Sequence, residues 1–277
     1  MAKDTEKIEP PRIDPPRREP PRQGPPPKNP PEKDPPTKEP PVKEPGQADQ
    51  EKQAAARASM RFVRDGQIVG LGTGSTAAYA IRFLGERVHK GLKIIGIPTS
   101  QRSKELAESL RIPVATLDDY QEIDVAIDGA DEFDPGLRII KGGGGALLRE
   151  KIVASASKLF VVIADSGKQV PVLGRFPLPV EVIPFAQALL VKRISALGAS
   201  VTLRQYAYGN PFITDEGHHI LDCQFGKIVD PPALARILSD VPGIVEHGLF
   251  INMADVVLVG KGPEVVELRR ESAAQSS

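Results

Sequence analysis

The feature that most restricts the fold of this chain is an alternation of short apolar runs with helix-like segments, which begins after about residue 54. The apolar runs are rich in β-branched residues and have the length of strands, as over residues 125–127 and 160–164. Helix-like stretches separate them, for instance over residues 77–88. Strands that alternate with helices predict a parallel sheet with helices on both faces.

The pattern changes at about Pro177, and this change predicts a second, smaller unit. Before it, we also expect a helix over residues 54–63 and strands over 67–71, 93–97 and 114–116. After it, we expect helices over 185–197 and 232–239 and strands over 179–183, 201–203, 213–214 and 219–225. This succession is typical of an inserted α+β subdomain. The apolar run over 255–260 resembles a buried strand that could return to the first sheet.

The start of the chain differs in composition from the rest. The dipeptide Pro-Pro recurs every five residues from Pro10 onward, with mostly charged residues between. Up to Pro45 the only aliphatic side chains in this stretch are Ile13 and Val42, too little apolar surface to offset the entropy of ordering it. We therefore expect residues 1–50 to form a disordered, polyproline II-like tail. Its Pro-x-x-Pro patterns would suit a proline-recognising domain, but a solvated spacer is the simpler interpretation, and the sequence identifies no partner.

Charge and cysteine content exclude several classes of protein. With 36 basic and 36 acidic residues, no global field favours nucleic acid or an anionic membrane as a partner. Cys223 is the only cysteine, which excludes an internal disulfide framework and a multi-cysteine zinc site. No run approaches the ~20 apolar residues that span a bilayer, and the first residues lack the apolar region of a secretory signal. The sequence thus predicts a cytoplasmic protein that binds neither nucleic acid nor membrane.

A glycine-rich segment follows the first predicted strand and precedes a helix-like stretch. It reads Gly-Leu-Gly-Thr-Gly-Ser-Thr over residues 70–76. At such a junction the backbone N–H groups and the helix dipole form an anion site, to which the hydroxyls of Thr73, Ser75 and Thr76 add donors. The segment lacks the lysine of a Walker A loop and is not a complete Gly-x-Gly-x-x-Gly motif. It suits a phosphate monoester, although a glycine-rich turn without a ligand fits the pattern equally well.

An acidic segment follows the strand predicted over residues 125–127. Asp128, Asp131 and Glu132 lie near the carboxyl end of that strand, where open α/β sheets usually bind ligands. Carboxylates held close together raise the pKa of one member, which suits proton transfer. A divalent metal held by these three acids is an alternative. An acidic turn that caps the next segment is the simplest interpretation of the string taken alone.

Four consecutive glycines, Gly142 to Gly145, separate Lys141 from a helix-like stretch that contains Glu150. Consecutive glycines cost much backbone entropy, so a folded protein keeps them where the backbone bends tightly or contacts a ligand. The helix that follows offers further unpaired N–H groups. A flexible linker is not usually followed at once by an apolar helix. We therefore favour a ligand-binding role for this segment, with Lys141 supplying a positive charge.

Together these segments resemble the A-type ribose-5-phosphate isomerases. The chain contains, in the order found in that family, the segments GLGTGSTA, DGADEFD, KGGGGALLREK, ADSGKQV and FPLPVEVIPFA, and the resemblance runs from about Gln53 to Gly260. It implies a Rossmann-like α/β domain over residues 51–176 and 250–277, with an inserted, smaller ferredoxin-like α+β subdomain over 177–249. It also implies a homodimer. The proline-rich tail has no counterpart in the family pattern.

The same resemblance implies roles in the interconversion of ribose 5-phosphate and ribulose 5-phosphate. Glu150 would move a proton between C2 and C1, Asp128 would assist ring opening and oxygen protonation, and Lys141, with Asp131 nearby, would stabilise the enediolate. The residues implied to hold the sugar phosphate are Thr73, Gly74, Ser75, Thr76, Asp128, Gly129, Ala130, Asp131, Lys141, Gly142, Gly143, Gly144 and Lys168. No metal or organic cofactor is required, because Lys141 and backbone dipoles can carry the developing charge.

Smaller expectations concern Thr99 and Ser100, which the resemblance places near the substrate. The histidines and Cys223 lie outside the motifs, and we interpret them as surface or structural side chains. An amino-sugar-phosphate deaminase or a phosphogluconolactonase on the same fold is a rival reading, against which the segment from Lys141 to Glu150 argues. A non-catalytic sugar-phosphate sensor would lack the base and carry a DNA-binding module. The tail could also make the protein a scaffold, which removal of residues 1–50 would test.

Overall fold

A six-stranded sheet forms the larger part of the structure, a computed structural model that describes residues 46–270. In spatial order its strands are β13 (Glu264–Arg269), β12 (Val256–Lys261), β6 (Phe160–Asp165), β3 (Val125–Gly129), β1 (Ile68–Leu71) and β2 (Ile95–Pro98). Neighbouring strands run parallel, except that β13 pairs antiparallel with β12. In this doubly wound order the direction of winding reverses between β1 and β3, which leaves a crevice at their carboxyl ends.

Helix α1 (Gln47–Ser59) begins within the segment predicted as a tail. It starts directly after Gly46, whereas the sequence predicted a helix over residues 54–63. The last residues of that prediction form a short 3-10 helix instead, η1 (Met60–Phe62). The remainder of the predicted tail, up to residue 45, lies outside the described residues.

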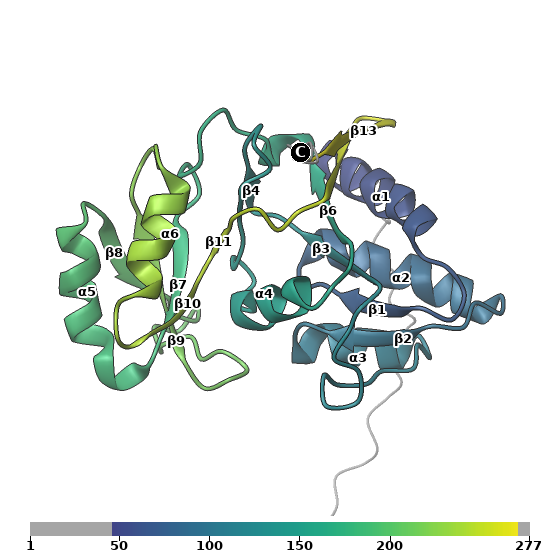
Figure 1. Ribbon diagram of the computed structural model, residues 1–277, viewed down its shortest axis with the longest axis horizontal. Helices are drawn as coiled ribbons and strands as arrows, with labels where there is room; N and C mark the ends of the chain where they lie inside the picture. Colours follow the sequence, from purple (N-terminus) through teal and green to yellow (C-terminus); the bar gives the residue numbers. More distant parts are fainter. Residues whose placement is uncertain (1–45, 271–277) are drawn as a thin grey trace, which may run out of the picture. The chain divides into compact units, whose positions relative to one another are not determined.

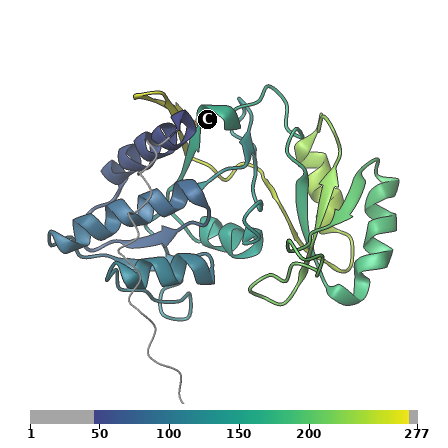
Figure 2. The same ribbon diagram turned by 180° about the vertical axis from the view of Figure 1, so that it is seen from behind.

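Alternate residues of the central strands face two separate apolar cores. On one face Ile163 of β6 packs with helices α1 and α2 (Ser75–His89). On the other face Val162 packs with α4 (Leu147–Ser155), as the two-residue period of a strand requires. A third helix, α3 (Gln101–Ser109), packs beside β2. Figures 1 and 2 show helices on both sides of the sheet, which confirms the predicted parallel sheet with two covered faces.

The second unit is a four-stranded antiparallel sheet with two helices. Its chain order is strand, helix, strand, strand, helix, strand, which is the ferredoxin-like succession. The elements are β7 (Leu178–Val182), α5 (Gln187–Ala196), β8 (Ser200–Leu203), β9 (His219–Gln224), α6 (Pro231–Ser239) and β10 (Ile244–His247), and the strands lie in the order β10-β7-β9-β8. Leu190, Ile194 and Leu238 from the helices are fully buried in its core. The α+β fold class is confirmed, while the domain boundaries stay a prediction.

A small three-stranded sheet, which the sequence did not predict, positions a key lysine. It consists of β4 (Glu132–Phe133), β5 (Ile139–Ile140) and β11 (Leu249–Phe250), and each strand has too few residues to show a period. Lys141 directly follows β5, and its backbone N–H donates to the carbonyl oxygen of Gly248 at 2.9 Å. The pairing of β5 with β11 therefore fixes the chain at Lys141.

Two of the predicted strands are wrong, and two further strands were missed. Residues 114–116 contribute only a single bridge, between Gly96 and Val114. Residues 213–214 lie in the β8–β9 connection, where the Thr214 hydroxyl bonds the Glu181 carboxylate instead of joining a ladder. The missed strands β10 and β13 each contain charged residues and no more than two consecutive apolar ones, so the sequence offered no long apolar run.

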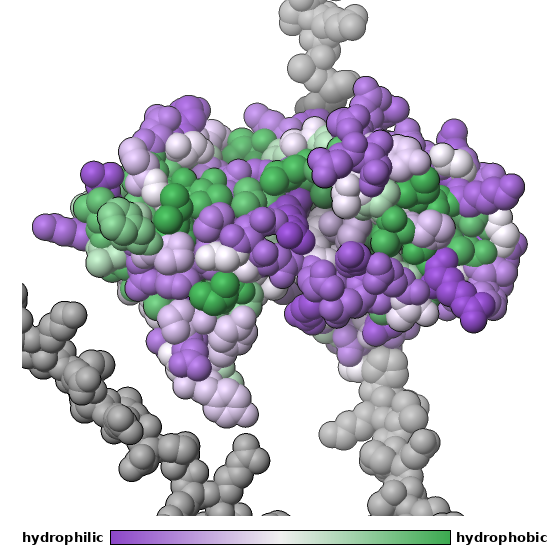
Figure 3. Space-filling model, turned by 90° about the horizontal axis from the view of Figure 1, so that it is seen from below, coloured by the Kyte–Doolittle hydropathy of each residue, from purple (hydrophilic) through white to green (hydrophobic). Residues whose placement is uncertain are grey.

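The surface in Figure 3 has apolar patches on both units, with hydrophilic residues between them. On the antiparallel unit Phe185, Tyr208 and Val229 are 99%, 95% and 86% exposed. Apolar groups exposed to this extent mark contact surfaces when they gather into a patch. Within residues 46–270, none of the helices has the length and apolar character to cross a membrane.

Candidate active site

Two loops meet where the winding of the sheet reverses. The glycine-rich loop after β1 lies against Asp128 near the end of β3, and the Thr73 N–H donates to Asp128 Oδ1 at 3.1 Å. The Gly129 N–H donates to the same oxygen at 2.7 Å. A Cβ added at Gly72 would lie 2.2 Å from this oxygen, so only glycine allows the close approach. The predicted loop and the predicted acid are therefore brought together.

Lys141 lies between two carboxyl groups in the interior of the protein. Its Nζ is 3.1 Å from Asp128 Oδ2 and 3.4 Å from Glu150 Oε1, and it donates to the Gly129 carbonyl oxygen at 2.6 Å. The three charged residues are between 2% and 4% exposed. They come from β3, from the end of β5 and from the first turn of α4, so the fold brings together three separate motifs of the sequence.

Burial governs the protonation of this cluster. It raises the pKa of Glu150 to about 8, with Lys141 opposing the shift and the charges of Asp128 and Asp131 adding to it. Burial also raises the pKa of Asp128, against the effect of Lys141. For Lys141 burial lowers the pKa, but the neighbouring carboxylates outweigh it and the net direction is upward. The site thus combines a firmly charged ammonium with a glutamate that titrates near neutral pH.

One carboxylate oxygen of Glu150 is placed to act as a base. Within residues 46–270, Glu150 Oε2 is buried and has no hydrogen-bond partner. A buried acceptor without a donor is costly, and such groups in folded proteins call for a functional explanation. Glu150 also lines a small cleft. This oxygen can therefore accept a proton from a bound molecule.

A small cleft opens above the cluster. It is lined by Thr73, Gly74, Ser75, Thr76, Gly129, Ala130, Asp131, Lys141, Gly142, Gly144, Glu150 and Lys168. Two members of the predicted substrate-binding set are not in this lining. Asp128 lies behind the cleft, against Lys141, and Gly143 donates its N–H to Asp131 Oδ2 at 2.6 Å beside it. The remaining predicted contacts converge on one cavity.

An adjoining hollow adds two basic residues that sequence reasoning missed. It shares Asp131 and Lys168 with the cleft and is also lined by Lys52 of α1 and Arg175. Nothing in the local sequence around Lys52 signals a site, because its neighbours in the hollow come from distant segments. Lys52 and Arg175 thus add basic groups next to Lys168, in a hollow that the acids Asp131 and Asp165 also line.

Thr99 and Ser100 do not line the cleft but contact Thr73, which does. Thr73 Oγ1 is 2.7 Å from both Thr99 Oγ1 and Ser100 Oγ. Neither residue lines the small cleft, so their observed contact is with Thr73, which they hold in place. Ser100 also caps α3 through its bond to the Ser103 N–H.

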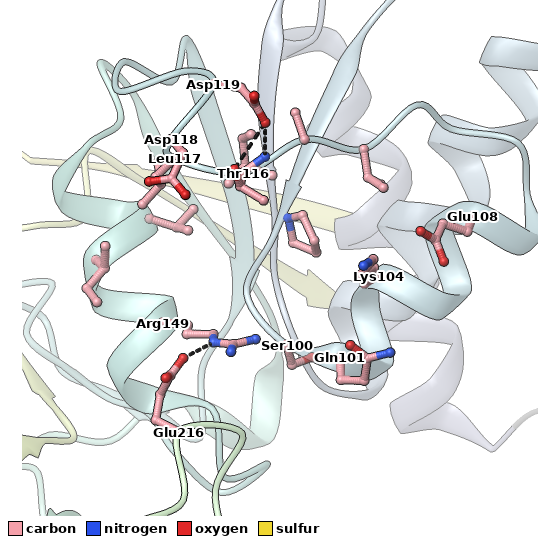
Figure 4. Close-up of a pocket in the computed structure, with 16 residues that line it drawn as sticks. Ser100, Gln101, Lys104, Glu108, Thr116, Leu117, Asp118, Asp119, Arg149 and Glu216 are labelled. Atoms are coloured by element: carbon pink, nitrogen blue, oxygen red, sulfur yellow. Dashed lines mark hydrogen bonds and ion pairs between the residues drawn. The ribbon is translucent and has the colours of Figure 1, made fainter.

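A larger pocket of about 770 Å³ lies on the other side of Ser100 (Figure 4). Its charged lining is mixed, with Lys104 and Arg149 facing several acids, and Arg149 pairs with Glu216. The buried cluster of Lys141, Asp128 and Glu150 opens onto the small cleft and not onto this pocket. Despite its smaller volume, the small cleft is the one that can perform acid–base chemistry.

The metal hypothesis for Asp128, Asp131 and Glu132 fails on geometry. Glu132 points away from the other two, and its carboxylate accepts the N–H groups of Gly174, at 2.6 Å, and Phe176, at 3.3 Å. In the part of the chain that the structure describes, no three His, Cys, Asp or Glu side chains are grouped to hold a metal ion.

The histidines and Cys223 lie outside the cleft, as expected. Burial raises the pKa of the Cys223 thiol to about 12, and it lowers the pKa of His247 to about 4, an effect to which the Lys151 charge adds. Both groups are therefore uncharged at neutral pH, which fits packed structural side chains.

The chain is similar in sequence to proteins of a single family. A sequence model of the family described as ribose 5-phosphate isomerase A (phosphoriboisomerase A) matches residues 95–263. The Ribose-5-phosphate isomerase A of Parvibaculum lavamentivorans is 50% identical over 228 residues, covering 79% of this chain and 99% of that protein. The Ribose-5-phosphate isomerase A of Synechococcus sp. is 52% identical over 228 residues, covering 81% and 99%.

Solved structures agree with the sequence relatives. A D-ribose-5-phosphate isomerase in complex with phospho-erythronic acid superimposes with a TM-score of 0.79 at 42% identity, covering 80% of this chain and 99% of that one. The ribose 5-phosphate isomerase A from Methanocaldococcus jannaschii gives a TM-score of 0.76 at 43% identity, covering 79% and 97%.

Proposed function

The chain belongs to the ribose 5-phosphate isomerase A family, and we propose that it interconverts D-ribose 5-phosphate and D-ribulose 5-phosphate through an enediolate. This reaction belongs to the non-oxidative branch of the pentose phosphate pathway. The observation that carries the proposal is the buried cluster in which Lys141 lies between Asp128 and Glu150. Two carboxyl groups around one ammonium supply a base, an acid and positive charge within a single site.

In this proposal Glu150 carries the proton between the two carbon atoms. Its ionised carboxylate takes the proton from C2 of the open-chain aldose, the electrons of that C–H bond form the C1–C2 double bond, and negative charge moves to O1. The protonated Glu150 then returns the proton to C1 as the C2 carbonyl forms. A pKa near 8 suits this role, because the group is a stronger base than an ordinary carboxylate and still ionises at working pH.

Lys141 and the two aspartates act on the oxygen atoms. The ammonium of Lys141 is fixed by its contacts before the reaction starts, so it can stabilise charge on O1 without reorganising. Asp128 moves the second proton between O1 and O2 and assists ring opening. Asp131, at the mouth of the cleft, orients the sugar hydroxyls.

We assign the phosphate group to the end of the cleft that the loop from Thr73 to Thr76 and Lys168 form. The loop from Thr73 to Thr76 offers N–H groups at the start of α2 together with hydroxyls. Lys168 supplies positive charge there, and Lys52 and Arg175 in the adjoining hollow add to it. A doubly charged phosphate is attracted to such a basic end, which would leave C1 and C2 near Glu150.

The test is conversion of ribose 5-phosphate by the purified full-length protein in excess chelator. Glu150→Gln keeps the size of the side chain but removes the base, and we expect a fall in kcat of about 10²- to 10⁴-fold. Glu86→Gln, on the exposed face of α2, is the matched control and should behave as the wild type. An inactive wild type that still binds the sugar phosphate would overturn the enzyme assignment in favour of a sensor. Activity that chelator abolishes would overturn the metal-free mechanism.

A homodimer and a cytoplasmic location complete the proposal. Phe185 and Val229 on the antiparallel unit are apolar and almost fully exposed, and a contact between two copies of the chain would cover such side chains. Sedimentation of the full chain would distinguish a dimer from a monomer. The single buried thiol, Cys223, is compatible with a reducing compartment.

A further inference from the structure

Arg204 connects the antiparallel unit to the glycine loop of the active site. It directly follows β8, and its Nη1 donates to the carbonyl oxygen of Gly142 at 2.7 Å and lies 3.3 Å from that of Gly143. The side chain is only 14% exposed. Sequence reasoning gave Arg204 no role, because 61 positions separate it from Gly143.

The rest of the guanidinium group is held by Asp222 of β9. Nε donates to Asp222 Oδ2 at 3.0 Å, and Nη2 donates to Oδ1. A bidentate pair of this kind fixes the plane of the guanidinium as well as its position. Nη1 is thereby aimed at the glycine loop, and a lysine in this place could not make both sets of contacts.

Fixing these two carbonyl groups also fixes two N–H groups. In a trans peptide the C=O and the following N–H point in opposite directions, and the described residues contain no cis peptide. With the Gly142 carbonyl on Arg204, the Gly143 N–H points the other way and donates to Asp131 Oδ2 at 2.6 Å. By the same geometry, Arg204 at the Gly143 carbonyl turns the N–H of the cleft-lining Gly144 away from the guanidinium.

The loop itself contributes one hydrogen bond to this arrangement, from the Gly145 N–H to the Gly142 carbonyl oxygen at 3.0 Å. Gly143 and Gly144 are exposed, and glycine peptides rotate at little steric cost. Phe212, from the same β8–β9 connection as Arg204, covers the next residue of the loop. A Cβ added at Gly145 would lie 2.4 Å from the Phe212 ring. The antiparallel unit therefore holds the glycine loop at two points.

We propose that Arg204 is a positioning residue for the isomerisation, which orients the two peptide groups that join Gly142, Gly143 and Gly144, so that the Gly143 N–H holds Asp131 and the Gly144 N–H faces the substrate. The inference rests on the proposed function. Donors that are oriented before the reaction stabilise developing negative charge without a further cost of ordering. A guanidinium on the carbonyl oxygens also polarises the peptides and strengthens their N–H groups as donors.

The test compares Arg204→Met with Arg193→Met, which removes an exposed arginine of the same unit on α5. Loss of a charged hydrogen-bond donor should lower kcat/KM of Arg204→Met by about 10- to 100-fold, mainly through kcat. Arg193→Met should equal the wild type, and Arg204→Lys should fall between the two. Dilute guanidinium added to Arg204→Ala should restore part of the activity.

A pH profile separates positioning from a merely structural role. The charged groups that face Glu150 are Lys141, Asp128 and Asp131, and the charge of Asp131 helps to raise the pKa of Glu150. If Arg204 holds Asp131 in place through Gly143, its loss lets Asp131 move away. The acid limb of kcat/KM in Arg204→Met should then shift to lower pH than in the wild type.

The possible outcomes are distinct. Wild-type turnover together with an Arg204→Met variant as active as Arg193→Met would overturn the inference and leave the proposed function intact. An inactive wild type would instead overturn the proposed function. Reduced activity with a lowered melting temperature, an unmoved acid limb and no recovery by guanidinium would show that Arg204 only stabilises the fold, which also overturns the inference.

Discussion

Two buried glutamates, Glu51 on α1 and Glu150 on α4, are treated in opposite ways by this fold. Their exposed fractions are almost equal, 3% and 4%. Glu51 accepts the N–H and hydroxyl of Ser166 and the N–H of Gly262, and these bonds lower its pKa to about 2. Glu150 has Lys141 beside one oxygen and, within residues 46–270, no hydrogen-bond partner on the other, and burial raises its pKa to about 8.

The two regions differ in the supply of donors and in the effect of burial, which is the main cause of the raised pKa of Glu150 but only a lesser, opposing influence on the pKa of Glu51. Around Glu51 backbone donors satisfy the carboxylate, so it ties α1 to the segments that follow β6 and β12. Around Glu150 the described residues supply few donors, so its carboxylate is more basic than usual and lies beside the fixed ammonium of Lys141. A buried carboxylate with a full set of donors is structural, whereas one with too few is available for a reaction.

Removing the ammonium from the reactive region should have the largest effect. In Lys141→Met the two buried carboxyl groups lose their shared positive charge, and the enediolate loses its main stabilising group. We expect kcat to fall by about 10²- to 10³-fold. Lys192→Met, on the exposed side of α5, is the control for loss of a lysine. If Lys141→Met folds and retains activity within tenfold of the wild type, electrostatic stabilisation by Lys141 is not essential.

The wild-type enzyme should show the raised pKa of Glu150 directly. The base must be ionised, so kcat/KM should rise about tenfold per pH unit at low pH and level off at about pH 8. The measurement is the initial rate of ribulose 5-phosphate formation at saturating and limiting substrate across this range. A profile already level at about pH 6 would mean that Glu150 resembles an ordinary carboxylate, and the contrast with Glu51 would shrink.

Replacement of Glu51, in the structural region, should lower the stability of the protein. In Glu51→Gln a neutral amide replaces a carboxylate that accepts several hydrogen bonds, and we expect the free energy of unfolding to fall by about 2 kcal/mol. Because the pKa of Glu51 is lowered from 4.5 to about 2, this contribution is present above pH 4.5 and is lost as the pH falls toward 2. Urea unfolding at neutral and acidic pH measures it, with Glu86→Gln as the control. A variant as stable as the wild type would contradict the structural role of Glu51.

The sequence could predict those parts of the protein in which local pattern and structure coincide. The parallel sheet followed from β-branched runs that alternate with helices, and the glycine segments marked the loops at its edge. Asp128, Lys141 and Glu150 could be chosen because each lies in a motif of the family. That Lys141 would lie within about 3.5 Å of both carboxyl groups could not be predicted, because the contact depends on how three separate segments fold together.

What the sequence could not predict depends on distant partners. Glu51 precedes the helix predicted over residues 54–63 and reads as one more charged residue, because its partner Ser166 is 115 positions away. Arg204 and Lys52 are missed for the same reason. The strands β4, β5 and β11 span two residues each, and they exist only because neighbouring chain segments pair with them. Local periodicity carries no information about such contacts.

The smallest effect we expect is the stability of Glu150→Gln, which should change in the opposite direction to that of Glu51→Gln. Between pH 4.5 and about 8 the folded protein holds a proton on Glu150 that the unfolded chain releases, so this group makes the wild type less stable as the pH rises through that window. Glutamine does not titrate, and we expect the variant to be more stable by about 1 kcal/mol near pH 8, with a smaller gain near pH 5. Urea unfolding at the two pH values measures the difference. If Glu150→Gln were less stable than the wild type near pH 8, then Glu150 would stabilise the fold, as Glu51 does. In that case the buried base would not lower the stability of the protein.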